Sequence, residues 1–319
     1  MVKARVALVT GGTGFVGANL VGRLVRDGWE THVIVRSDSN LSVLSGVEHA
    51  IQIHVHDGST EQLIEIVKFA SPLVVFHLAS LFLAQHTPQD IEPLIHSNLL
   101  FSTQLIEAMS RVDGVCHLIN TGTSWQHFES KEYSPVCLYA ATKQAFEAIL
   151  TYYVEASNIS AISLQLHDTY GPNDSRAKLF TLLRRTARTQ EKLLMSPGEQ
   201  LIDLVYIDDV LDAYLLAAER CLQNEVVRHE IYSVTSGNPI KLRDLVATYG
   251  QITGQTLEVE WGARAYRPRE VMLPWSKGSV VPGWAPKITL AEGIALMEKP
   301  TQLPKSESEV MNRKINAED

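Results

Sequence analysis

The chain has 319 residues, of which 45% are hydrophobic and 20% are charged, as expected for a globular protein with a sizeable core. The formal net charge is -8 and no basic block occurs, which disfavours nucleic acid as a partner. No apolar run is long enough to span a bilayer, and the apolar run at the N-terminus ends at glycines, which disfavours a membrane partner and a signal peptide. The three cysteines, Cys116, Cys137 and Cys221, lie far apart and match neither a disulfide framework nor a metal site. These features predict a cytoplasmic protein with no bound metal.

Apolar strands and helical segments alternate along the first half of the chain. Strands are predicted at 5–10, 30–37, 51–57, 72–80, 114–124 and 159–171, and helices at 18–28, 63–70 and 91–112 and around Tyr139. This alternation predicts an α/β fold with a parallel sheet covered on both faces. After a loop at 171–179 the elements become short and mixed, which predicts a smaller C-terminal α/β lobe. We therefore expect a large domain at 1–170, a smaller lobe at 171–299 into which the chain partly crosses back, and a polar tail at 300–319.

The first strand leads into a glycine-rich loop, "VTGGTGFVGANL", in which Gly11, Gly14 and Gly17 have a GxxGxxG spacing. Glycine is needed there for a tight turn, for close approach of a pyrophosphate and for packing of the helix on the strand. The amides at the helix N-terminus would then face the anion. The context of strand, loop and helix predicts a dinucleotide site that includes Thr13, Phe15 and Val16, whereas the alternative is a plain tight turn.

The end of the second strand, "VIVRSDS", predicts which dinucleotide is bound. An acidic residue usually stands there to bind a ribose 2′-hydroxyl, but Arg36 and Ser37 occupy the place. Arginine suits a 2′-phosphate, so NADP(H) is favoured, while Asp38 close behind keeps NAD(H) as an alternative. Asp57, followed by Gly58, ends the third strand and is a candidate for the adenine amino group.

Tyr139 and Lys143 stand four residues apart in a helical segment, which places both side chains on one helix face. Such a pair is often only a packed tyrosine and a solvated lysine. Beside a nicotinamide it acquires a role, because an ammonium and the positive nicotinamide ring lower the pKa of a phenol and let it exchange a proton with a carbinol oxygen. A hydroxyl is also wanted to orient that oxygen. Thr123 is the first candidate, with Thr121 and Ser124 as alternatives that spacing alone does not separate.

Several motifs spread over nearly the whole chain resemble the extended short-chain dehydrogenase/reductase family, in its nucleotide-sugar epimerase/dehydratase group. They are "GGTGFVG", "YAATK", "HLAS", "SNLL", "HDTYGPND", "GEQLIDLVYIDDVLDAYLLA" and "VPGWAPKITLAEGI". The resemblance implies a Rossmann-type doubly wound parallel sheet in an NADP-binding domain at 1–170, and a lobe at 171–299 that binds a nucleotide-sugar. It also implies that Leu78, Ala79 and Ser80 pass the nicotinamide ribose and that Asn98 belongs to the cofactor site. It also implies a homodimer formed through the helices that carry Asn98 and Tyr139.

The chain departs from the family pattern on the substrate side. Ile202 stands where the family has an arginine, and "SWQHF" follows Thr123 in place of "VYG". The candidates for substrate binding are Ser124, Trp125, His167, Asp168, Arg267 and Arg269, and the two arginines suit a diphosphate. Trp125 and His127 could equally pack within a loop, and the arginines could be solvated.

No carboxylate follows Thr123 directly, which disfavours the elimination catalysed by the family's dehydratases. The short gap between Thr123 and Tyr139 is similar to that of CDP-linked 4-keto-deoxyhexose reductases of the paratose and abequose synthase kind. The sequence therefore favours NADPH-dependent reduction of the C4 ketone of a nucleotide-linked deoxy sugar, with CDP favoured over dTDP. The alternatives are a nucleotide-sugar 4-epimerase with bound NAD, a reductase of small carbonyl compounds, and a non-catalytic NADP-sensing regulator.

Overall fold

The central element is a seven-stranded parallel sheet. The computed structural model describes residues 5–112, 117–223, 225–226 and 228–298, so Cys116 and the predicted tail at 300–319 lie outside the described residues. The sheet has the strand order β11-β6-β5-β4-β1-β2-β3. Its strands are β1 (Val6–Thr10), β2 (Glu30–Arg36), β3 (Ile51–His56), β4 (Val74–His77), β5 (His117–Thr123), β6 (Ser160–Leu166) and β11 (His229–Val234). The prediction of a Rossmann-type sheet is confirmed.

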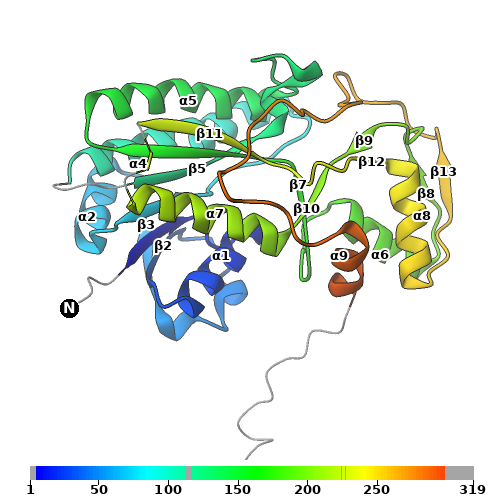
Figure 1. The fold of residues 1–319 in the computed structure, drawn as a ribbon, viewed down its shortest axis with the longest axis horizontal. Helices are drawn as coiled ribbons and strands as arrows, with labels where there is room; N and C mark the ends of the chain where they lie inside the picture. The colour runs from blue at the N-terminus through cyan, green and yellow to red at the C-terminus, as the bar shows by residue number, and fades with distance from the viewer. Residues whose placement is uncertain (1–4, 113–116, 224, 227, 299–319) are drawn as a thin grey trace, which may run out of the picture.

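Helices cover both faces of the sheet, and the alternation of side chains along the strands explains why. On β1, Ala7 and Val9 point to one core, whereas Leu8 points to the other. The first core is closed by α1 (Phe15–Arg26) and α7 (Ile207–Leu222), and the second by α2 (Thr60–Ala70), α4 (Phe101–Ser110) and α5 (Leu138–Ala156). Figure 1 shows α5 and α7 on opposite sides of the sheet.

The helix predicted at 91–112 is continuous but not uniform. It consists of α3 (Ile91–Ile95), a π-helical turn (His96–Leu100) and α4. The π turn contains the buried Asn98, and such turns often mark functional sites. Sequence periodicity did not predict the change of helix type, because the apolar spacing shifts by only one residue.

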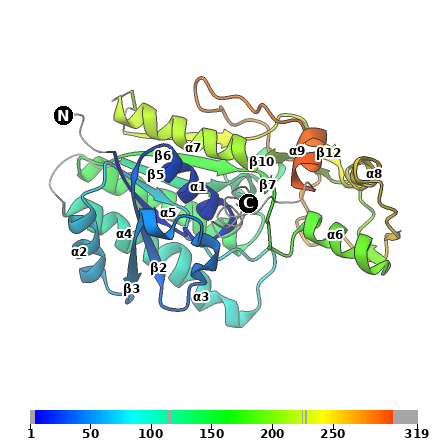
Figure 2. The same cartoon turned by 90° about the horizontal axis from the view of Figure 1, so that it is seen from below.

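The strand predicted at 159–171 is wrong in its length, because it breaks at His167. β6 stays in the central sheet, and β7 (Asp168–Tyr170) pairs instead with β10 (Leu204–Tyr206). A lobe at one end of the sheet contains two further two-stranded pairs, β9 (Leu201–Ile202) with β12 (Ile240–Lys241) and β8 (Leu193–Met195) with β13 (Val259–Trp261). The lobe also contains the helices α6 (Leu179–Thr189), α8 (Leu242–Thr253) and α9 (Leu290–Met297) (Figure 2). Because of this break, His167 and Asp168 lie at the boundary between the sheet and the lobe.

Two segments beyond residue 170 return to the central sheet. α7 packs on β5 and β6, and β11 pairs with β6. We therefore propose that the substrate lobe consists of the parts of 171–298 that remain when α7 and β11 are assigned to the sheet. Among the described residues, no helix combines the length and the apolar character that a membrane crossing requires.

Candidate active site

The glycine-rich loop lies at the carboxyl end of β1, and close backbone contacts require its glycines. Gly11 has a φ of +71°, and a Cβ on it would lie 2.6 Å from the backbone nitrogen of Ala79. A Cβ on Gly17 would overlap the carbonyl oxygen of Gly11. The amide of Gly14 donates to that same oxygen at 3.0 Å, and Gly14 is the N-cap of α1. The loop therefore places a helix N-terminus at the mouth of a cavity, which suits an anion.

Two connected cavities run along the carboxyl edge of the sheet. The edge cavity is lined by Thr13, Arg36, Ser37, Asp57, Gly58 and Ala79, among others. The central cavity, of about 520 Å³, is lined by Phe15, Val16, Gly17, Thr123, Tyr139 and Lys143, among others. Both share Gly11, Gly14, Leu78 and Ser80. The residues predicted for the dinucleotide thus line one continuous groove, with the exception of Asn98.

Some of the side chains that line the edge cavity already form hydrogen bonds with neighbouring residues. The Arg36 Nε donates to Asp38 Oδ1 at 3.0 Å, and both side chains are 75% exposed. An exposed pair of this kind is weak and exchanges readily with a ligand. The Asp57 carboxylate accepts from the amide and the hydroxyl of Ser59, which lower its pKa.

Tyr139 and Lys143 project from the first turns of α5 into the central cavity, and both are nearly fully buried. Burial raises the pKa of the Tyr139 phenol above its usual range, while hydrogen bonds with Ser80 and Thr123 act in the opposite direction. Burial lowers the pKa of Lys143 to about 8, against the opposing charge of Glu147. The lowered phenol pKa that the sequence predicts beside a positive nicotinamide ring stays a prediction, whereas in the protein alone burial raises the pKa of Tyr139. A raised pKa favours the protonated phenol, which is the form that can donate a proton.

Of the three candidates Thr121, Thr123 and Ser124, Thr123 is the one whose hydroxyl hydrogen-bonds with Tyr139. It is the last residue of β5, and its Oγ1 also accepts from the amide of Trp125 at 3.3 Å. The hydroxyl of Thr121 is instead 2.6 Å from the hydroxyl of Tyr214, and Ser124 begins a 3-10 turn.

Asn98 lies outside the groove and is a structural brace. Its Oδ1 accepts from the Ser80 hydroxyl at 3.1 Å and from the Leu81 amide at 2.7 Å. Its Nδ2 donates to the Leu81 carbonyl and to the Thr142 hydroxyl, both at 3.0 Å. The Thr142 hydroxyl in turn donates to the Tyr139 carbonyl. Asn98 therefore connects the segment of Ser80 and Leu81 to the helix that carries the phenol, a role that a motif alone does not reveal.

A buried polar network beneath Lys143 was missed by the sequence reasoning. Glu147, one turn further along α5, accepts from Asn120 Nδ2 and from the Ser163 hydroxyl, each at 3.0 Å. His229 Nε2 lies 3.3 Å from the same carboxylate. A carboxylate four residues after the lysine on one helix face was the available signal. Its charge favours the ammonium form of Lys143.

A third, outer cavity is lined by five of the six predicted substrate residues. It joins the central cavity through Ser124, Trp125, His167 and Asp168, and Arg267 lines its far side. Burial lowers the pKa of His167, against the opposing charges of Asp203 and Asp168.

Arg267 and Arg269 differ in position. Arg267 forks onto Glu270, with distances of 3.0 and 2.7 Å, and its guanidinium lies over Trp125. Arg269 donates to the Ser134 hydroxyl at 2.8 Å and stacks on Phe128, and it is absent from the lining of the three cavities. Of the two predicted arginines, Arg267 therefore lines the outer cavity and Arg269 does not.

A family model described as the NAD dependent epimerase/dehydratase family matches residues 7–234. The chain therefore belongs to this family. A CDP-abequose synthase of Salmonella typhimurium is 27% identical over 298 residues, covering 90% of this chain and 95% of that protein. A UDP-glucose 4-epimerase of Mycolicibacterium smegmatis is 26% identical over 313 residues, covering 90% and 96%.

Solved structures confirm the family's fold for this chain. A UDP-glucuronic acid 4-epimerase from Bacillus cereus, in complex with UDP-glucuronic acid and NAD, has a TM-score of 0.79 and 20% sequence identity, covering 91% of this chain and 97% of that one. A UDP-glucose 4-epimerase from Thermus thermophilus in complex with NAD has a TM-score of 0.75 and 24% identity, covering 91% and 97%. At these identities the likeness concerns the fold alone. Membership of the family indicates an oxidoreductase with a nicotinamide cofactor.

Proposed function

We propose that the protein reduces the C4 ketone of a nucleotide-linked 4-keto-deoxy sugar with NADPH. The observation that carries the proposal is the cluster of Thr123, Tyr139 and Lys143 in a cavity continuous with the glycine-rich loop. The similarity to CDP-abequose synthases supports a CDP-linked substrate. The homodimer and the cytoplasmic location stay predictions from the sequence.

Thr123, Tyr139 and Lys143 each have a separate role in the proposed reaction. Bound NADPH supplies a hydride to the carbonyl carbon. Thr123 orients the carbonyl oxygen by a hydrogen bond, and Tyr139, whose burial keeps it protonated, donates its proton to that oxygen. Lys143, with Glu147 behind it, supplies a positive charge that stabilises the resulting phenolate and holds the nicotinamide ribose. Trp125 and Phe82 wall the cavity and limit access of water.

Arg36 supports the choice of NADPH, because its exposed guanidinium lies in the edge cavity and, among the residues that the structure describes, pairs with Asp38 alone. The second candidate is a 4-epimerase with bound NAD. It is favoured by Asp38 in the same cavity and by the NAD present in epimerases of the same fold.

The test is consumption of NADPH and NADH by the purified protein, offered CDP-, dTDP-, UDP- and GDP-linked 4-keto-6-deoxy sugars made in situ. We expect stoichiometric loss of NADPH with the CDP-linked sugar. Arg36→Ala should raise KM for NADPH by about tenfold or more and leave KM for NADH unchanged, because a charge-assisted hydrogen bond to the 2′-phosphate is lost. Arg111→Ala, which removes another exposed paired arginine, is the matched control. Failure to consume either cofactor, together with NAD released on denaturation, would favour the epimerase.

A further inference from the structure

The cavities that would receive the substrate contain few cations that are free to bind it. Within the described part of the chain, the lysines and arginines that line the central and outer cavities are Lys143, Arg176, Lys178 and Arg267. A substrate with a diphosphate needs at least one of them to supply unused N–H groups.

Three of these four cationic side chains already have a carboxylate partner or a role at the reaction centre. Lys143 is buried beside Tyr139 and serves the reaction centre. Arg267 forks onto Glu270, and Arg176 forks onto Asp174, with both distances of the latter at 2.7 Å. Two parallel hydrogen bonds to a carboxylate hold a guanidinium firmly and neutralise much of its field.

Lys178 is different. Its ammonium makes one hydrogen bond among the described residues, to Asp168 Oδ1 at 3.2 Å, although an ammonium has three N–H donors. Its side chain is 31% exposed, and it lies over the ring of Phe82, 5.4 Å from the centroid. Phe82 packs edge-on against Tyr139. Lys178 is therefore one aromatic ring away from the reacting phenol.

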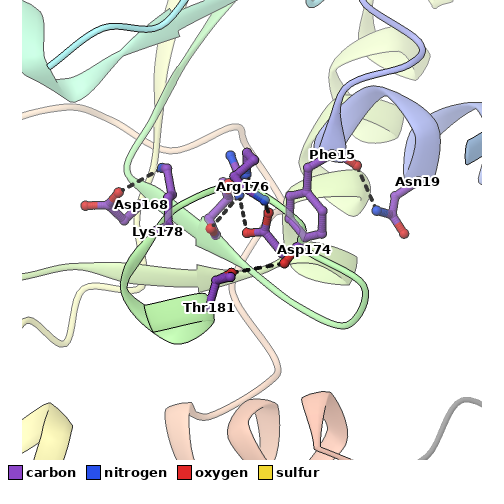
Figure 3. Close-up of polar contacts among 8 residues, drawn as sticks. Phe15, Asn19, Asp168, Asp174, Arg176, Lys178 and Thr181 are labelled. Atoms are coloured by element: carbon purple, nitrogen blue, oxygen red, sulfur yellow. Dashed lines mark hydrogen bonds and ion pairs between the residues drawn. The ribbon is translucent and has the colours of Figure 1, made fainter. Parts of the chain in front are cut away.

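The position of Lys178 is fixed by the loop between β7 and α6, seen in Figure 3. Asp174 organises this loop, because its carboxylate accepts from the amide and the guanidinium of Arg176 and its carbonyl accepts from Thr181. Arg176 also donates to the Thr169 carbonyl at 3.0 Å and stacks on Phe15 of the glycine-rich loop, 4.4 Å from the ring centroid. The loop is thus pinned to the cofactor side, and Lys178 follows two residues later.

Asp168 explains why a cation is needed at this place. It lines both the central and the outer cavity, so a substrate that reaches from Thr123 into the outer cavity passes its carboxylate. An uncompensated carboxylate there would repel a diphosphate, and Lys178 provides the compensation. We propose that Lys178 binds the diphosphate of the substrate next to the sugar, and that Arg176 is a positioning residue that holds Lys178 there. This inference rests on the proposed nucleotide-linked substrate.

The test uses the full chain and isothermal titration with CDP, in the presence of saturating NADPH. Lys178→Gln should weaken CDP binding by about tenfold or more, the effect of one charge-assisted hydrogen bond, and reduce the salt dependence of binding. Lys178→Arg should restore most of the affinity. Lys192→Gln removes another paired lysine, one that lies outside these cavities, and should change nothing.

Arg176→Lys tests the positioning role, since it keeps a charge but loses the fork. It should raise KM for the substrate and weaken CDP binding while kcat changes less than threefold. A role confined to folding would instead lower the thermal midpoint with CDP affinity intact, which would overturn the positioning role.

The outcomes distinguish failure of the Lys178 assignment from failure of the proposed substrate class. Equal CDP affinity in Lys178→Gln and wild type overturns the assignment of Lys178. Weakened NADPH binding with unchanged CDP binding also overturns it, because the phosphate contacted would then be the cofactor's. A wild-type protein that binds none of CDP, dTDP, UDP and GDP overturns the proposed substrate class, and the ligand of Lys178 with it.

Discussion

The two sides of the central cavity differ in how their buried polar atoms are partnered. On the cofactor side, the Ala79 amide donates to Thr10 Oγ1, which contacts His77 Nδ1, and His77 Nε2 contacts the Ser102 hydroxyl. On the substrate side, His167 Nε2 and Gln200 Oε1 are buried without a hydrogen-bond partner in the described structure. An unpartnered buried polar atom is costly, so a region that keeps one is suited to receive a partner from a ligand. We therefore expect the cofactor side to be largely preformed and the substrate side to be completed when a ligand binds.

The largest effect is expected at Tyr139, which lies between the two sides. Tyr139→Phe keeps the ring against Phe82 but removes the proton donor, so kcat should fall by about 10²- to 10⁴-fold, the usual share of a general acid. Binding of NADPH and of CDP should change less than threefold, as measured by titration. Normal turnover by this variant would remove the proton-transfer role.

Two single substitutions, one on each side of the cavity, test the comparison through their effects on the free energy of unfolding. Asn98→Ala should lower the free energy of unfolding by about 3 kcal/mol, because it leaves the amide and carbonyl of Leu81 without their buried partners. His167→Phe removes a nitrogen that has no partner and keeps a ring of similar size, so stability should stay within about 1 kcal/mol or rise.

Urea unfolding of both variants, followed by circular dichroism, measures the difference. A large loss in His167→Phe would mean that the substrate side is as fully organised as the cofactor side. A small loss in Asn98→Ala would mean that the brace contributes little.

The same contrast explains what the sequence could predict. Gly11, Gly17, Tyr139 and Lys143 were found from it because their roles depend on backbone geometry and fixed helical spacing, which are local properties. The contacts of Lys178 and Asn98 could not be predicted because their partners, Asp168 and Leu81, are set by how separate elements meet. Arg269 was assigned to the site from its residue type alone, and the fold turns it to Ser134. The burial that raises the pKa of the Tyr139 phenol could not be predicted, because burial is a tertiary property.

The smallest effect is a pH dependence that arises on the cofactor side. The Ser102 hydroxyl donates to the Asn98 carbonyl, so its oxygen accepts from a proton on His77 Nε2, and His77 Nδ1 accepts from Thr10. The chain of hydrogen bonds therefore requires a neutral imidazole. Burial, with a contribution from Lys143, lowers the pKa of His77 from 6.5 to about 3.

The sign follows from proton uptake. Between pH 6.5 and 3 the unfolded chain binds a proton at this histidine and the folded chain does not, so stability falls as the pH falls. The loss is about 1.4 kcal/mol per pH unit, or about 2 kcal/mol between pH 6.5 and 5. His77→Gln can still donate and accept but cannot be protonated, so its free energy of unfolding should fall by about 2 kcal/mol less over that interval. Only the difference in slope matters, because other buried histidines affect both proteins equally. Parallel pH profiles would mean that His77 takes up a proton in the folded state, and the cofactor side would then be less rigid than its hydrogen bonds indicate.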